Sequence, residues 1–233
     1  MFAEFTPKNL EKAVDLARHI ATFAEFEFTA CHVRMRMTDP AKVVYMDLIL
    51  IPSTYKCDKE TRFGINLQMF YKLLKSLDSD ETVEIEADES VMKINQGSRY
   101  HTLISQDIPF ATAAIADYAG ARIKLSTKML QRYIRAIGNI APAFELHYVP
   151  QSDTLFLESV NSMYRTLFSI DTGVTPNEGA EEYKRNFMVK FFEMALNPSL
   201  SETVELTMGE SLMISYDVDS VSVIITVSGY TDA

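Results

Sequence analysis

The chain carries one long sequence pattern twice. The segment ETVEIEADESVM, residues 81–92, returns 121 positions later as ETVELTMGESLM, residues 202–213, with seven of the twelve letters identical. Apolar positions elsewhere match at an offset of 120, as Leu10 matches Leu130 and Ile20 matches Ile140. A period this long predicts two similar globular domains, and not a solenoid of short repeats.

The length of the chain agrees with two domains. It has 233 residues, so each half is large enough for a hydrophobic core of its own. We expect an N-terminal domain over residues 1–107, a linker over 108–120 and a C-terminal domain over 121–233. The linker is more apolar than a flexible, solvated linker. Its apolar residues therefore either line a surface groove or pack between the two domains and hold them together.

Apolar spacing predicts helices and strands in both halves. Apolar residues three and four positions apart predict four helices, over 7–24, 67–77, 126–140 and 183–196. Alternation and apolar runs predict strands over 33–37, 43–51, 83–87, 99–105, 122–125, 144–148, 154–158, 163–170 and 221–227. The fold class is therefore α+β, with two helices packed on antiparallel sheets in each half.

Charge is divided unevenly between these elements. The whole chain has a net charge of −10, which by itself argues against binding a polyanion. The four predicted helices, however, contain 11 basic and 3 acidic residues, while the rest of the chain contains 11 basic and 29 acidic ones. Positive charge is thus concentrated on the helices, and negative charge on the strands and loops.

The basic residues of the helices lie at helical spacing, away from the apolar stripes. One such face is usually just a solvated surface, but four of them in an acidic chain favour contact with nucleic acid. The candidate nucleic-acid-binding residues are Lys8, Lys12, Lys72, Lys75, Lys128, Arg132, Arg135 and Lys190.

Several classes of protein are disfavoured by the same sequence. No run of about 18 apolar residues predicts a membrane span, and no export signal is visible, so we expect an intracellular protein. Two cysteines and four scattered histidines fit neither a disulfide framework nor a zinc site. The chain lacks a phosphate-binding glycine loop and the common hydrolase motifs, so we expect no enzyme, no cofactor and no bound metal.

Three segments carry a resemblance to a known family. They are MRMTDPAKVVYMDL, residues 35–48, YKCDKETRFGINLQMFYKLLKSL, residues 55–77, and ETVELTMGESLMISYDV, residues 202–218. In these segments, and in the order of its elements, the chain resembles the DNA sliding clamps of the proliferating cell nuclear antigen type, found in archaea, eukaryotes and some viruses. The resemblance implies the DNA clamp fold and a ring, usually of three subunits, whose basic helices line a hole around double-stranded DNA.

The resemblance also implies function, location and partners. Such a clamp catalyses nothing. It is a polymerase processivity factor that binds DNA without sequence specificity and tethers replication and repair enzymes. Its partners are a clamp loader, DNA polymerase and other proteins with a docking peptide, and copies of itself in a homotrimer. It acts in the nucleus if the source is eukaryotic or a virus replicating there, and otherwise in the cytoplasm.

Two further sites are implied by the family's organisation. The ring closes between edge strands of neighbouring subunits, which here places Tyr100, Leu103, Tyr164, Leu167 and Phe168 at the subunit interface. Partner peptides dock beside the linker and the C-terminal tail, at Thr38, Lys42, Val43, Ile108, Pro109, Phe110, Val227 and Tyr230.

An alternative keeps the fold but not the homotrimer. The chain is then a subunit of a heterotrimer or checkpoint clamp, or a monomeric viral polymerase accessory factor. Heterologous interfaces look alike whether identical or different chains complete a ring, so sequence leaves this alternative open.

Overall fold

The computed structural model describes residues 1–108, 120–161, 163–173, 181–218 and 221–229. The chain divides into two compact units, Met1–Ala113 with Asp217–Ile224 and Ala114–Tyr216 with Ile225–Ala233. The predicted linker falls largely on residues 109–119, which lie outside the described residues.

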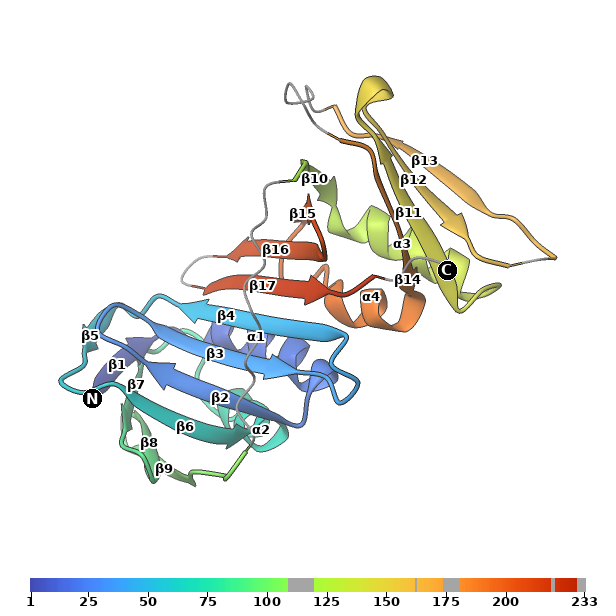
Figure 1. Ribbon diagram of the computed structural model, residues 1–233. Coiled ribbons are helices and arrows are strands. Elements are labelled where there is room, and N and C mark those ends of the chain that lie inside the picture. The colour runs from blue at the N-terminus through green and yellow to red at the C-terminus, as the bar shows by residue number, and fades with distance from the viewer. Residues whose placement is uncertain (109–119, 162, 174–180, 219–220, 230–233) are drawn as a thin grey trace. The chain divides into compact units, whose positions relative to one another are not determined.

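The first unit contains two groups of antiparallel strands (Figure 1). One sheet has the order β5-β1-β7-β8-β9, and a second run of neighbouring strands has the order β4-β3-β2-β6. The strands of the sheet are β5 (Thr54–Lys56), β1 (Phe2–Phe5), β7 (Val83–Ala87), β8 (Val91–Gln96) and β9 (Arg99–Ile104). Those of the second run are β4 (Val44–Leu50), β3 (Val33–Thr38), β2 (Phe23–Phe28) and β6 (Thr61–Asn66).

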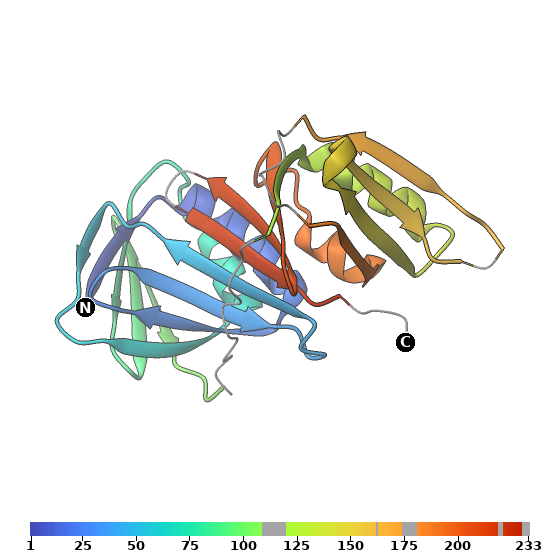
Figure 2. The ribbon, with the colours of Figure 1, turned by 45° about the horizontal axis from the view of Figure 1, so that its top comes forward.

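Two helices cover one face of the β4-β3-β2-β6 strands (Figure 2). Helix α1 (Pro7–Ile20) has proline in its first turn, where the missing N–H costs nothing. Helix α2 (Leu67–Lys75) begins after Asn66, whose side chain accepts a hydrogen bond from the Met69 amide at 3.0 Å. Between helices and strands, the fully buried Phe26 meets Phe70 edge-to-face at 5.6 Å, as aromatic cores favour.

The second unit repeats this arrangement. Its strands β13 (Leu167–Asp171), β12 (Thr154–Ser159), β11 (Ala143–Val149) and β14 (Tyr183–Met188) lie in that order, as β4-β3-β2-β6 do. Likewise β10 (Arg122–Ser126), β15 (Thr203–Met208) and β16 (Leu212–Val218) repeat β1-β7-β8. The duplicated sequence therefore folds into a duplicated topology, and the predicted α+β class is confirmed.

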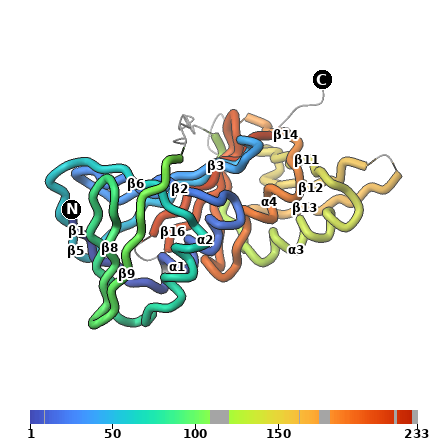
Figure 3. Tube along the Cα trace, turned by 90° about the horizontal axis from the view of Figure 1, so that it is seen from below, coloured from blue at the N-terminus to red at the C-terminus, as the bar shows by residue number. Residues whose placement is uncertain are grey.

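Helices α3 (Thr127–Gly138) and α4 (Val189–Ala195) complete the second unit and pack on each other. Figure 3 shows α1 beside α2 and, within the other unit, α3 near α4. A short 3-10 turn, Pro150–Ser152, joins β11 to β12. The last strand, β17 (Val221–Val227), matches its predicted bounds and is divided between the two units.

All four predicted helices were too long, and two of them included residues of a neighbouring strand. The prediction over 7–24 was wrong beyond Ile20, because Phe23–Phe28 forms β2 with alternating apolar residues inside. The prediction over 183–196 was wrong for its first half, since Tyr183–Met188 is β14 and pairs antiparallel with β11. Apolar residues at the end of β14 and the start of α4 together imitate one helical stripe, so the spacing alone was misleading.

The predicted strand over 163–170 was also wrong at its start. Strand β13 begins only at Leu167, and the chain bends at Met163. The Met163 amide donates to the Asn161 side chain at 2.9 Å, and the Thr166 amide donates to the Ser159 hydroxyl at 2.8 Å. Short polar side chains thus take backbone partners that a longer strand ladder would need.

Candidate nucleic-acid interface

The first unit exposes basic side chains on both of its helices. Lys8 on α1, and Lys72 and Lys75 on α2, are exposed, while Lys12 on α1 is half-buried. Lys8, Lys12 and Lys72 form no ion pair with any residue that the structure describes. Their charge is therefore free to meet an external anion.

Arg18 on α1 is a basic residue that the sequence-based selection left out. Its Nε donates to Asp15 Oδ1 at 2.7 Å, and its Nη1 donates to Gln68 of α2 at 3.3 Å. Its guanidinium also lies 4.3 Å from the ring centroid of Tyr71 on α2. Arg18 thus ties the two helices together. The acidic residue three positions earlier was a sequence signal only for the ion pair within α1.

The second unit exposes its basic residues in the same manner. Lys128, Arg132 and Arg135 on α3 and Lys190 on α4 are all exposed. None of the four forms an ion pair within the described ranges. Arg132 lies 5.3 Å from the ring centroid of Tyr133, and Lys190 lies 4.6 Å from that of Phe191. The aromatic ring contacts one side of the cation, and the other side of the cation stays available to a phosphate.

A hollow of about 630 Å³ lies beside the end of α3 and the start of α4. Arg135 and Lys190 line it, and so does Glu193. The helices approach closely beside it, because a Cβ on Gly138 would lie 2.8 Å from Val189 Cγ1. The hollow therefore belongs to the basic surface of these two helices.

The two basic residues on β3, by contrast, are neutralised by carboxylates. Arg34 on β3 donates from Nε to Asp47 of β4 at 2.7 Å, and this hydrogen bond raises the pKa of Arg34. Arg36 on β3 pairs with Glu25 on β2 at 2.5 Å. The four helices as the structure bounds them carry nine basic and three acidic residues, because Lys184 and Arg185 belong to β14. The excess of positive charge on the helices is smaller than predicted, but its sign is the same.

The predicted partner-docking residues are only partly described. Thr38 and Val43 are half-buried, and Lys42 is exposed, where β3 turns into β4. Ile108 is half-buried, whereas Val227 is fully buried at the end of β17. Pro109, Phe110 and Tyr230 lie outside the described residues.

The segment leading to Ile108 is fixed against β6. The Gln106 amide donates to the Gly64 carbonyl at 2.9 Å, and the Gly64 amide donates to the Ser105 hydroxyl at 3.2 Å. A Cβ on residue 64 would lie 2.1 Å from the Gln106 carbonyl oxygen, so only glycine permits this approach.

The predicted interface residues lie on or beside the edge strands β9 and β13. Tyr100 is 74% exposed and Leu167 47% exposed, and Tyr164, just before β13, is 65% exposed. Leu103 is half-buried, and Phe168 stacks on Tyr133 of α3 with centroids 4.3 Å apart. The sequence-based selection left out Ile104 and Met163, which are 72% and 81% exposed.

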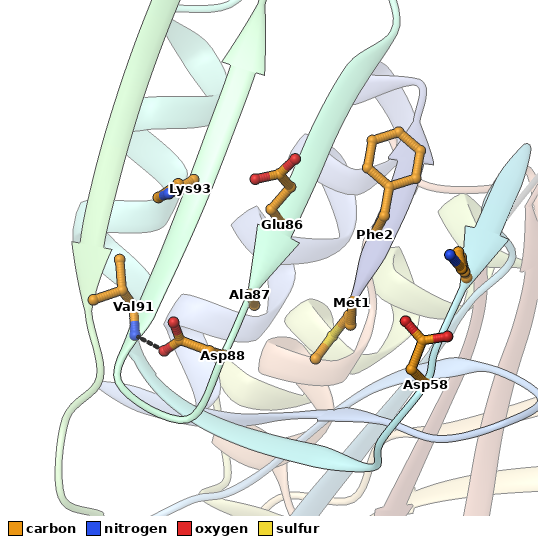
Figure 4. A pocket seen from close by; sticks show the side chains of 9 residues that line it. Met1, Phe2, Asp58, Glu86, Ala87, Asp88, Val91 and Lys93 are labelled. Carbon is orange, nitrogen blue, oxygen red and sulfur yellow. Dashed lines mark hydrogen bonds between the residues drawn. The ribbon is translucent and has the colours of Figure 1, made fainter.

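Figure 4 shows a different hollow, of about 370 Å³, at one end of the first unit. It is lined by residues of β1, β5, β7 and β8 and contains none of the predicted site residues. Asp88 accepts the Ser90 amide at 2.7 Å and the Val91 amide at 2.8 Å there, and these backbone hydrogen bonds lower the pKa of Asp88. This carboxylate therefore closes the β7–β8 turn.

Two kinds of site are not found in the described part of the chain. No group of three or more histidine, cysteine, aspartate or glutamate side chains there could hold a metal ion. No helix among these residues has the length and apolar character needed to span a bilayer.

Comparisons with known proteins point in one direction. The family model described as "Proliferating cell nuclear antigen, N-terminal domain" matches residues 3–98. DNA polymerase sliding clamp 1 of Thermococcus kodakarensis is 23% identical over 229 residues, which cover 90% of this chain and 88% of that protein.

Solved structures share the fold over the whole chain. The proliferating cellular nuclear antigen of Entamoeba histolytica superposes with a TM-score of 0.86 at 15% identity, covering 99% of this chain and 98% of that one. The PCNA of A. fulgidus, solved with the C-terminal region of FEN-1 bound, gives a TM-score of 0.84 at 16% identity, covering 100% and 99%.

Proposed function

Because this chain belongs to the proliferating cell nuclear antigen family of DNA sliding clamps, we propose that it encircles duplex DNA and tethers polymerases and other replication and repair enzymes to it. The observation that carries the proposal is the set of exposed Lys and Arg side chains, on four helices of an acidic chain, that have no ionic partner among the residues the structure describes. Such cations hold phosphates without base-specific contacts, which lets a clamp slide.

We further propose that the clamp is a closed homotrimer. A β9 edge on one subunit and a β13 edge on the next offer unpaired backbone groups and exposed apolar side chains. A head-to-tail contact between them that closes into a ring removes the exposed edges. A heteromeric ring or a monomeric accessory factor is the alternative to this assembly.

In this proposal the chain acts as a tether inside the cell and has no catalytic activity of its own. A clamp loader opens the ring, and partner enzymes dock through a short peptide. The bound C-terminal region of FEN-1 in the A. fulgidus protein supports a peptide of that kind as a partner here. The residues proposed for docking are those of the β3–β4 turn together with Ile108 and the tail.

Retention on closed DNA tests this function most directly. The protein is loaded onto nicked circular DNA with a clamp loader and ATP, and half of the sample is then cut to linear DNA at moderate salt. We expect retention on circles, rapid loss from linear DNA, and restored retention when bulky protein blocks close both ends. Equal retention on circular and unblocked linear DNA would contradict encirclement, because a gripping protein does not need closed ends.

A further inference from the structure

The loop that joins β3 to β4 is organised around one carboxylate. Asp39 Oδ1 accepts the Val43 and Val44 amides, both at 2.7 Å, and Oδ2 accepts the Ala41 amide at 2.9 Å. The same residue closes the loop through its backbone, since its amide donates to the Val44 carbonyl at 3.0 Å. One side chain therefore satisfies three of the loop's backbone donors.

Asp39 is also buried, although it has no cationic partner. It is 3% exposed and forms no ion pair with a described residue. A buried carboxylate without a cation needs hydrogen bonds to its charged form, and the three amides supply them. Removal of this carboxylate leaves three backbone N–H donors that must find water or another acceptor.

The conformation that Asp39 supports is not one the chain prefers. Lys42 has a φ of 58°, in the left-handed region that disfavours residues with a Cβ. Its amide donates to the Asp39 carbonyl at 2.9 Å, and the neighbouring amides on both sides are bound to the Asp39 carboxylate. Without those bonds we expect the loop to relax away from this shape.

We propose that Asp39 is a positioning residue for partner docking, because its carboxylate fixes the backbone that presents Thr38, Lys42 and Val43 to an extended peptide of a partner protein. The inference rests on the proposed docking role of this loop. A loop already held in its binding conformation does not lose conformational freedom when the peptide arrives, so affinity is gained without any direct contact from Asp39.

The test uses Asp39→Ala and the milder Asp39→Asn in the full chain. Asparagine keeps one side-chain oxygen for the Val43 and Val44 amides and loses the acceptor for Ala41. Hydrogen exchange of the amides of residues 41, 43 and 44 reports loop order. Fluorescence anisotropy with a labelled peptide of the FEN-1 C-terminal region reports docking. We expect Asp39→Ala to speed exchange at these amides and to raise the Kd roughly tenfold, with Asp39→Asn between it and the unsubstituted protein.

Asp88→Ala is the matched control. Asp88 also accepts two backbone amides, from Ser90 at 2.7 Å and Val91 at 2.8 Å, but its turn carries none of the proposed docking residues. This variant should loosen the β7–β8 turn and leave the Kd for the peptide unchanged.

Three results would overturn the inference. Unchanged exchange in Asp39→Ala would remove the claimed loop order, and an unchanged Kd despite faster exchange would remove the link to docking. An unsubstituted protein that binds no peptide would overturn the proposed docking site itself, and the positioning role with it.

Discussion

At the scale of single residues, the buried pair of Glu25 and Arg36 makes the first prediction. Glu25 is 1% exposed, and its Oε1 lies 2.5 Å from Arg36 Nη2, while Oε2 has no hydrogen-bond partner in the described part of the chain. Glu25→Ala leaves Arg36, in a largely dry site, with Glu27 at 3.1 Å as its one ion-pair partner among the described residues. Breaking a buried ion pair costs about 3 kcal/mol, so we expect a loss of that order in the free energy of unfolding.

Urea denaturation measures this loss. The control is Glu84→Ala, which removes an exposed glutamate from β7 and should change the free energy of unfolding by less than about 0.5 kcal/mol. Equal effects of the two substitutions would contradict a stabilising role for the Glu25–Arg36 pair.

Tyr183 predicts a stability change at alkaline pH. Burial raises its pKa to about 12, although nearby Arg185 acts in the opposite direction, and its hydroxyl has no hydrogen-bond partner among the residues that the structure describes. An unfolded tyrosine ionises near pH 10, so above that pH the unfolded chain releases a proton that the folded chain keeps. The contribution of Tyr183 is therefore complete below pH 10 and is lost, by about 2 kcal/mol, as the pH rises towards 12.

Tyr183→Phe isolates this contribution. The phenylalanine variant should be as stable as the unsubstituted protein at pH 8, because no hydrogen bond is broken, and should lose less stability between pH 10 and 12. Other tyrosines and the lysines titrate in both proteins, so they cancel in the comparison. Parallel curves of stability against pH would show that Tyr183 ionises in the folded protein as it does in the unfolded one.

At the scale of elements, the basic helices predict a change in DNA binding without a change in fold. Lys72 on α2 and Arg132 on α3 are exposed and have no ionic partner among the described residues. Lys72→Ala with Arg132→Ala should shorten the DNA that the polymerase makes per binding event. It should also reduce the slope of DNA retention against salt concentration by the amount that corresponds to roughly one to two phosphate contacts.

The control for that double variant changes two lysines that are not on helices. Lys56→Ala with Lys93→Ala removes the same number of charges from β5 and β8, where both side chains are exposed. It should leave processivity and salt dependence unchanged. Equal losses in both double variants would mean that total charge matters, and not its place on the helices.

The elements also show what the sequence could and could not predict. Apolar periodicity predicted all four helices and the duplicated α+β plan, because burial of one face leaves a repeating signal. It did not separate β14 from α4, since Phe187 and Phe191 are both buried and lie at helical spacing. Nor could it pair Glu25 with Arg36, or Arg18 with Tyr71, because such contacts depend on strand register and on how helices cross.

At the scale of the whole molecule, the proposed head-to-tail ring makes a prediction that a symmetric contact does not. The unsubstituted protein should scatter light with three times the 26.4 kDa mass of the chain at micromolar concentration. Tyr100→Asp alters only the β9 edge and Leu167→Asp only the β13 edge, so each variant alone should be monomeric. Each introduced aspartate would place a buried, unpaired charge in the contact, and this charge prevents the contact from forming.

A mixture of the two variants distinguishes the kinds of assembly. The Tyr100→Asp protein keeps its β13 edge and the Leu167→Asp protein keeps its β9 edge, so one intact contact forms between them and the mixture should give one-to-one dimers. Met69→Asp, on an α2 residue that is 61% exposed, should remain trimeric. A one-subunit mass for the unsubstituted protein would favour a heteromeric ring or an accessory factor. A mixture that stayed monomeric would show that β9 does not pair with β13, because the one undamaged copy of that contact had failed to form.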